Sequence, residues 1–268
     1  MGVVGFATHG FRSVTGIERH LTRVLRSATL TGMLILDRDR QIVLSVARFQ
    51  QLTAGHVRAI HFEGHASNTP VDRALKRLVE GRYLARIERR MIGGTGAGSG
   101  QYVYQLGRNG WTLAGREGKY WPFRAVNYHT LAIADTYVEM LRWQQLGRII
   151  VLGFHTEPDS WRKAGGEDLR PDLYVQIADR LNGRELSLWV EVDLGTERLS
   201  VIRHKLASYW RAYQHAGDSM EIFPQVLFLA PDDDRAKHLR WTIEQGDQEA
   251  QELFMVSTVD QFGGLYFS

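Results

Sequence analysis

The residue types that could carry out chemistry gather in the stretch 170–213. Asp172 precedes one short apolar run, while Glu191 and Asp193 stand at the end of a second run. Proteins hold hard cations such as Mg²⁺ with one or two carboxylates and several waters, and the ion activates a water and offsets charge on a phosphate. Lys205, on the segment that follows, would supply an ammonium that adds to this stabilisation. The pattern therefore predicts a Mg²⁺ or Mn²⁺ site built from Asp172, Glu191 and Asp193, with Lys205 as a further catalytic group.

A hairpin is expected to position these acids. The runs 173–178 and 186–192 are rich in residues that favour strands. The Asn-Gly pair at 182–183 between them is a turn signal, and two neighbouring strands joined in this way form a hairpin. Antiparallel pairing then brings Asp172, at the start of one strand, and Glu191, near the end of the next, to the same end of the sheet.

A helix is expected after the turn at 195–196, because apolar residues recur there at helical spacing. These residues are Leu199, Ile202, Leu206, Tyr209 and Tyr213. Lys205 lies at the edge of this apolar face and can reach toward the carboxylates. The aromatic side chains of the helix are interpreted as packing residues rather than as a base-stacking platform. His155 and His204 are interpreted as structural histidines, and Glu197 as a residue that favours the helix start electrostatically.

Two further interpretations of the acids stay open. Glu191 and Asp193 share one face of their strand, where two carboxylates repel each other unless a cation or a base lies between them. Lys205 can be that base with no metal present, which makes the cluster a salt bridge. In the other interpretation, the two acids are simply exposed at the end of the strand.

Composition places the chain among globular proteins. With 268 residues, 44% hydrophobic and 24% charged, it is long enough for two modest domains. There is no cysteine, which excludes disulfides and thiolate metal sites and agrees with a cytoplasmic setting. The longest apolar runs are far shorter than the roughly 18 residues of a membrane span, and the first residues lack the pattern of a signal peptide. We therefore expect no membrane partner.

Charge is divided unevenly along the chain. Residues 1–126 contain 19 Lys and Arg against 8 Asp and Glu, a net charge of +11, whereas residues 127–268 contain 14 against 22, a net charge of −8. Such a division indicates that the first half faces a polyanion, with nucleic acid as the leading candidate, while the second half carries a cluster of carboxylates. The alternative is that the basic residues are scattered over a solvated surface.

Three helices and a two-stranded ribbon are predicted in the first half. The helices are expected over 37–49, after the N-cap Thr53, and from the Thr-Pro pair at 69–70 to Gly81. The strands are expected over 83–87 and 102–106, on either side of a glycine-rich loop. This loop lacks the endings of phosphate-binding motifs and is interpreted as a wing tip. The arrangement is that of a winged helix-turn-helix.

In such a fold the third helix enters the major groove of DNA and the wing touches the flanking backbone. The expected groove contacts come from the third helix and the expected phosphate contacts from the wing: Arg73, Lys76 and Arg77, then Arg86, Arg89 and Arg90. A winged helix used for protein contacts is the alternative.

The second half predicts an α/β domain. A helix over 127–146 precedes a strand over 148–154, the hairpin, the helix that carries Lys205, and a further strand over 224–229. Another helix and strand follow, over 235–245 and 253–256. The fold class is thus α/β, with α+β character overall. The expected domains are a basic arm, a winged helix and an α/β domain, over 1–33, 34–126 and 127–268.

The order of the candidate site residues resembles that of the PD-(D/E)XK nuclease superfamily. Pro-Asp at 171–172 comes first, then Glu191-x-Asp193 on a hydrophobic strand, then a lysine on the next helix. The superfamily usually has a lysine two positions after the glutamate, where this chain has Asp193. Some members carry that lysine on the following helix, which Lys205 matches. The resemblance implies a nuclease-like second domain whose lysine has moved or whose site is inactive.

The combination of both halves is similar to the replication-relaxation proteins of plasmids and integrative elements, over residues 34–229. The stretches that carry this likeness are RPDLYVQI, LWVEVDLGTE and HKLASYW, together with the winged-helix pattern. The likeness implies a role in plasmid replication and DNA relaxation in a mobile genetic element. It implies double-stranded DNA as the partner. Other replication or conjugation proteins, and a second copy of the chain, are compatible additional partners.

Two functions follow as expectations. The first is a metal-dependent endonuclease or nickase that binds duplex DNA through the winged helix and cuts it in the second domain. The alternative is a non-catalytic replication or transfer accessory factor, or a transcriptional regulator, with a degenerate nuclease-like domain. A relaxase that forms a covalent tyrosine link to DNA is disfavoured, because no histidine triad with metal-ligand spacing accompanies a candidate tyrosine.

Overall fold

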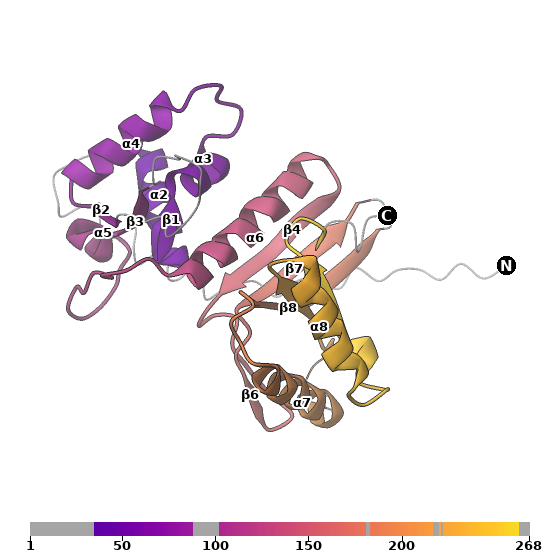
Figure 1. Ribbon diagram of the computed structural model, residues 1–268. Helices are drawn as coiled ribbons and strands as arrows, with labels where there is room; N and C mark the ends of the chain where they lie inside the picture. Colours follow the sequence, from indigo (N-terminus) through magenta and orange to yellow (C-terminus); the bar gives the residue numbers. More distant parts are fainter. Residues whose placement is uncertain (1–34, 88–101, 181–182, 217–219, 221, 263–268) are drawn as a thin grey trace, which may run out of the picture.

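The chain has a mixed α/β fold with a winged-helix element in its first half (Figure 1). The computed structural model describes residues 35–87, 102–180, 183–216, 220 and 222–262. The basic arm predicted over 1–33, the predicted wing tip, Arg89 and Arg90 lie outside the described residues. No helix in the described part of the chain has the length and apolar character needed to cross a membrane.

The winged-helix element is built from four helices and a small sheet. The helices are α2 (Asp37–Phe49), α3 (Ala54–His61), α4 (Thr69–Glu80) and α5 (Arg108–Leu113). The strands are β1 (Gln51–Thr53), β2 (Leu84–Ile87) and β3 (Val103–Leu106), in the antiparallel order β1-β3-β2. Thr53 caps α3 as predicted, because its hydroxyl accepts a hydrogen bond from the His56 backbone N–H while the His56 ring pairs with the Thr53 N–H.

The three helices and two ribbon strands predicted in this half are confirmed. The strand β1 was not predicted. It is only three residues long and exists through its pairing with β3, more than fifty residues later, so local sequence carries no sign of it.

The second half contains a five-stranded sheet in the order β10-β9-β8-β7-β4. Its strands are β4 (Ile149–Thr156), β7 (Leu173–Asp179), β8 (Arg184–Val192), β9 (Gln225–Ala230) and β10 (Phe254–Thr258). Strand β8 pairs antiparallel with β7 and parallel with β9. The helices are α6 (Tyr128–Gln145), α7 (Leu199–Ala216) and α8 (Asp233–Glu244). The predicted order of helices and strands is confirmed, and the short hairpin of β5 (Arg162–Ala164) and β6 (Glu167–Leu169) is an addition.

Helices cover both faces of this sheet (Figure 1). Alternate residues of β8 enter different cores: Leu188 and Val190 pack on the side of α6, whereas Trp189 packs on the side of α7 and α8. Because Glu191 is two residues from Trp189, it points to the side of α7. The side of the sheet that a residue faces therefore decides which helix its side chain contacts, and Glu191 faces α7.

The apolar core on the α6 side continues into the winged-helix element. The ring of Phe49, at the end of α2, lies 5.3 Å from that of Tyr137 in α6 and 6.0 Å from that of Phe154 in β4. His56 in α3 and Asp135 in α6 are 2.7 Å apart. The boundary predicted at residue 126 falls just before α6 and stays a prediction.

Candidate active site

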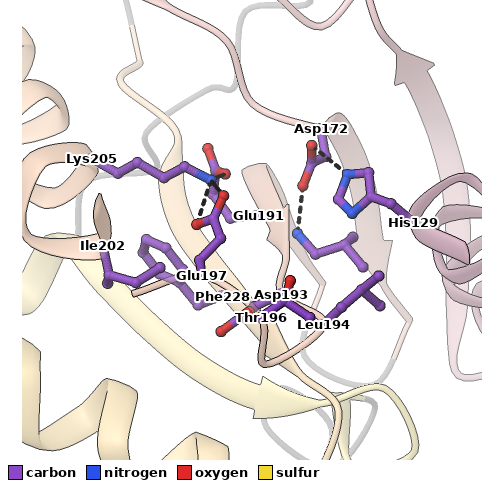
Figure 2. A pocket seen from close by; sticks show the side chains of 11 residues that line it. His129, Asp172, Glu191, Asp193, Leu194, Thr196, Glu197, Ile202, Lys205 and Phe228 are labelled. Carbon is purple, nitrogen blue, oxygen red and sulfur yellow. Dashed lines mark hydrogen bonds and ion pairs between the residues drawn. The ribbon is translucent and has the colours of Figure 1, made fainter. Parts of the chain in front are cut away.

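A cavity of about 260 Å³ opens where the carboxyl end of β8 meets the first turns of α6 and α7. Its polar lining is mostly charged and comes from α6, the start of β7, the end of β8, the following loop and α7. These residues are His129, Asp172, Glu191, Asp193, Glu197 and Lys205. Figure 2 shows Lys205 extending into the cavity from one side and His129 from the other.

The hairpin of β7 and β8 brings Asp172 and Glu191 together. Leu173 pairs with Val190, so the residue before β7 lies opposite Glu191. The backbone N–H of Val192 donates a hydrogen bond of 2.7 Å to the Asp172 carboxylate, which fixes that side chain at the end of β8. The hairpin predicted from the Asn-Gly turn, and the meeting of the two acids at one end of the sheet, are therefore confirmed.

Asp172 has a second partner, the His129 ring, whose Nε2 lies 2.9 Å from Oδ1. The hydrogen bond to Asp172 raises the pKa of His129 despite partial burial, which acts in the opposite direction. His129 lies in the first turn of α6, where the side chain of the N-cap Asn127 accepts hydrogen bonds from the backbone N–H groups of His129 and Thr130. The imidazole and the Val192 N–H thus hold one Asp172 oxygen each.

Glu191 is buried and hydrogen-bonded at both oxygens. Lys205 Nζ donates to Oε2 over 2.9 Å and the Tyr209 hydroxyl donates to Oε1 over 2.6 Å. Burial and the nearby charge of Asp172 raise the pKa of Glu191 above its usual range, although Lys205 and Tyr209 oppose that shift. Burial, with the charge of Glu191 beside it, also keeps the pKa of Tyr209 well above its usual value, so the phenol stays a donor.

Lys205 bridges two acids, since its Nζ also lies 3.1 Å from the Glu197 carboxylate. Burial alone would lower the pKa of this lysine, but Glu191 and Glu197 together outweigh burial and raise it. The ammonium is therefore charged at neutral pH.

Asp193 takes a different partner from the other acids. Its Oδ2 lies 2.6 Å from Arg235 Nε in α8, and its Oδ1 accepts a hydrogen bond from the Gly195 N–H. Arg235 also donates to the Glu197 backbone carbonyl. Asp193 lines the cavity, yet its charge is already matched by an arginine that fastens the loop after β8.

The carboxylates of the cavity are oxygen donors of the kind that a divalent ion requires. Three carboxylates, those of Asp172, Glu191 and Glu197, face one ammonium and the His129 ring in a largely buried site. This excess of negative charge is what a bound cation relieves. Within the described residues, no three His, Asp or Glu side chains are gathered closely enough to hold a metal by themselves. Two carboxylates suffice for Mg²⁺, which keeps several waters, so Asp172 and Glu191 fit such an ion.

Residues 44–226 match the protein family described as replication-relaxation. The chain belongs to the replication-relaxation family. This confirms the resemblance found in the sequence and connects the protein with the replication and relaxation of DNA. A comparison with curated proteins finds no match.

Among solved structures, this replication-relaxation protein is similar to the crystal structure of the adhesin competence repressor AdcR from Streptococcus pyogenes. The identity is 16% and the TM-score 0.25. The alignment covers 38% of this chain and 66% of the repressor, slightly less than two thirds of its length.

Four of the six predicted DNA-contacting residues lie on α4 and β2, and the other two, Arg89 and Arg90, are outside the described residues. Arg73 and Lys76 are exposed on α4, and Arg86 is exposed on β2 with its guanidinium 5.0 Å from the centre of the Tyr102 ring. Arg77 makes two hydrogen bonds, of 2.7 and 2.8 Å, to the buried carboxylate of Asp39. Arg77 therefore fastens α4 to α2, whereas Arg73 and Lys76 extend away from the core.

Sequence reasoning missed the site contacts of three residues: Glu197, which pairs with Lys205, and His129 and Tyr209. His129 reaches Asp172 from 43 residues away, and the only local sign of its position is the N-cap Asn127 that starts its helix. Tyr209 was assigned to packing, which its ring fulfils at 5.7 Å from the Trp189 ring, but its hydroxyl also binds Glu191. Its spacing of four residues from Lys205 places both on one face of α7.

Proposed function

We propose that this replication-relaxation protein binds duplex DNA through its winged helix and cuts or nicks a phosphodiester bond at the cavity between β7, β8 and α7. The family assignment supports a role in DNA processing. The order of α6, β4, β7, β8, α7 and β9 agrees with the core that the sequence pattern shares with the PD-(D/E)XK nucleases.

One observation carries the proposal: Lys205 Nζ lies 2.9 Å from Glu191, in the same cavity as Asp172. The strand position where the superfamily has its lysine holds Asp193. A lysine from α7 nevertheless brings an ammonium beside the strand carboxylate. The spatial set of an aspartate, a glutamate and a lysine is thereby complete.

Asp172 and Glu191 are the residues that would hold a Mg²⁺ or Mn²⁺ ion. Such an ion supplies an activated water and offsets the charge that develops on the phosphate. Each carboxylate oxygen has two acceptor positions, so the hydrogen bonds from His129, Val192, Lys205 and Tyr209 leave the oxygens free to accept a further ligand.

The remaining residues position these groups. Lys205 presents its ammonium to a phosphate that enters the cavity, where partial burial strengthens the attraction. His129 and Tyr209 orient Asp172 and Glu191. Asp193 and Arg235 brace the loop after β8, and neither is assigned a role as metal ligand.

The test is incubation of supercoiled plasmid with the purified protein in Mg²⁺, in Mn²⁺ and in chelator. We expect open-circular or linear product that needs the metal and disappears in the Asp172→Asn and Glu191→Gln variants. Glu185→Gln is the matched control, because Glu185 lies on the same strand but is exposed at its other end. Cleavage that persists in Asp172→Asn would end the assignment.

A non-catalytic DNA-binding accessory factor is the second candidate. The observation that favours it is that protein groups already pair with the acids, Lys205 with Glu191 and Arg235 with Asp193. This function predicts that the plasmid is bound but not cut in any metal, and that calorimetry detects no Mg²⁺ or Mn²⁺ binding to the wild-type protein.

A further inference from the structure

Residues 116–127, called here the strap, join α5 to α6 without forming a helix or a strand. In Figure 1 this segment runs outside the small sheet before α6 begins. The strap contains three basic residues, one acid and three aromatic residues. Neither the winged helix nor the cavity accounts for this composition.

Two buried glutamines hold the backbone of the strap in place. Gln51 and Gln105 face each other across β1 and β3. Gln105 accepts a hydrogen bond from the Phe123 N–H and donates one to the Phe123 carbonyl. Gln51 donates a hydrogen bond to the Ala125 carbonyl and accepts one from the Asn127 N–H. The glutamines thus fix the strap backbone at Phe123, Ala125 and Asn127.

The other end of the strap is fastened too. The Arg116 guanidinium donates to the Ala47 carbonyl over 2.8 Å, and the Tyr120 hydroxyl donates to the Leu106 carbonyl over 3.0 Å. The segment is therefore held along its length by hydrogen bonds to α2, β1 and β3. Side chains that it exposes are exposed in a fixed position.

Large apolar side chains are what the strap exposes. Trp121 is 65% exposed and Phe123 is 46% exposed. Lys119 Nζ lies 5.7 Å from the centre of the Trp121 ring, and Arg124 is exposed beside Phe123. Aromatic faces alternating with cations, at the surface and on a fixed backbone, are suited to stacking on bases while neighbouring phosphates are attracted.

The strap leads directly into the cavity. It ends at the N-cap Asn127, and His129, two residues later, is hydrogen-bonded to Asp172. Tyr128 between them is about half-exposed. The end of the strap therefore adjoins a residue that lines the cavity.

From these contacts we infer that the strap is a stacking platform for an unpaired DNA strand, with Trp121 and Phe123 against bases and Lys119 and Arg124 near phosphates. The inference deepens the proposed function and rests on it, because it names the single-stranded segment that approaches the cavity. Paired bases in a duplex stack on each other and do not offer their faces, so the platform selects unpaired DNA.

The experiment measures binding of a fluorescein-labelled oligothymidine, about 20 nucleotides long to exceed one binding site, and of a duplex of equal length. Buffers contain chelator, so binding is recorded whether or not the cavity cuts DNA. The double variant Trp121→Ala, Phe123→Ala is compared with the wild type and with Trp241→Ala, which removes an exposed tryptophan from α8. Thermal unfolding of each protein confirms that it is folded.

We expect the double variant to bind oligothymidine at least about fivefold more weakly, which is the effect of losing one stacked base. Its affinity for the duplex should stay unchanged. Trp241→Ala should bind both the oligothymidine and the duplex as the wild type does. An unchanged single-strand affinity in the folded double variant overturns the inference. So does an equal loss for the duplex, or an equal loss in Trp241→Ala. None of these outcomes depends on plasmid cleavage, so the inference and the proposed nuclease activity fail separately.

Discussion

Lys205 and Glu191 are 14 residues apart in the chain and form an ion pair of 2.9 Å inside the candidate site. The glutamate comes from the end of β8 and the lysine from the second turn of α7. Because Glu191 is almost completely buried, the ammonium provides most of the compensation for its charge. The same lysine is thus tied to both the stability of the fold and the proposed chemistry.

Replacing this lysine separates the two contributions. We expect Lys205→Met to abolish plasmid cleavage, with a loss of at least about 100-fold for an electrostatic group at the reacting phosphate. We also expect it to lower the free energy of unfolding by about 1–3 kcal/mol, because a buried carboxylate loses its charged donor. Urea unfolding and the plasmid assay measure the two effects. Lys237→Met, which removes an exposed lysine on α8, should change neither, and equal effects in both variants would contradict the role of Lys205.

Tyr209 offers a milder change to the same carboxylate. Tyr209→Phe keeps the ring against Trp189 and deletes only the hydroxyl that donates to Glu191. We expect a destabilisation of about 1 kcal/mol, the usual value of one hydrogen bond, and a reduced but measurable cleavage rate. The matched control is Tyr213→Phe, an exposed tyrosine one turn later on α7. If Tyr209→Phe cleaves at the wild-type rate, the hydroxyl does not position Glu191.

These contacts also show what the sequence could predict. The strands β7 and β8 have strong apolar runs and an Asn-Gly turn between them, so the hairpin and the meeting of Asp172 with Glu191 follow from local patterns. The pairing register of a hairpin is set by its turn and by the two strands beside it, which are close together in the sequence. The apolar spacing of α7 likewise placed Lys205 at the edge of the buried face, within reach of the acids.

Local sequence patterns could not predict the contacts between segments that are far apart in the chain. Glu139 in α6 is paired with Arg142 at 3.5 Å and does not line the cavity. Instead, α6 meets the acids through its first turn, where His129 lies. The pairing of Asp193 with Arg235 depends on how α8 packs after β9, and nothing in the residues around Asp193 indicates it.

The arginines of α4 should divide into two classes. Arg77→Ala leaves the buried Asp39 carboxylate without its charged donor, so we expect a loss of about 1–3 kcal/mol in unfolding free energy. Arg73→Ala removes an exposed charge and should leave stability unchanged. Because Arg73 is expected to face the DNA, we expect the substitution to weaken duplex binding and to reduce the slope of log K against log salt by about 1. Unfolding curves and binding titrations at several salt concentrations test both variants. An unchanged salt slope in Arg73→Ala would show that Arg73 does not contact the DNA.

We expect the titration of His61 to make the stability of the protein depend on pH. This histidine joins α3 to α2 through a hydrogen bond of 2.9 Å to Ser45, and burial, with the charge of Arg38, lowers its pKa from 6.5 to about 4. Between these values the unfolded chain takes up a proton that the folded protein does not, so stability falls as pH decreases from about 6.5 to about 4. In His61→Gln that contribution is absent, because glutamine does not titrate. Unfolding free energies measured across this window should therefore fall more steeply in the wild type than in His61→Gln, and parallel curves would show that His61 does not titrate with a lowered pKa.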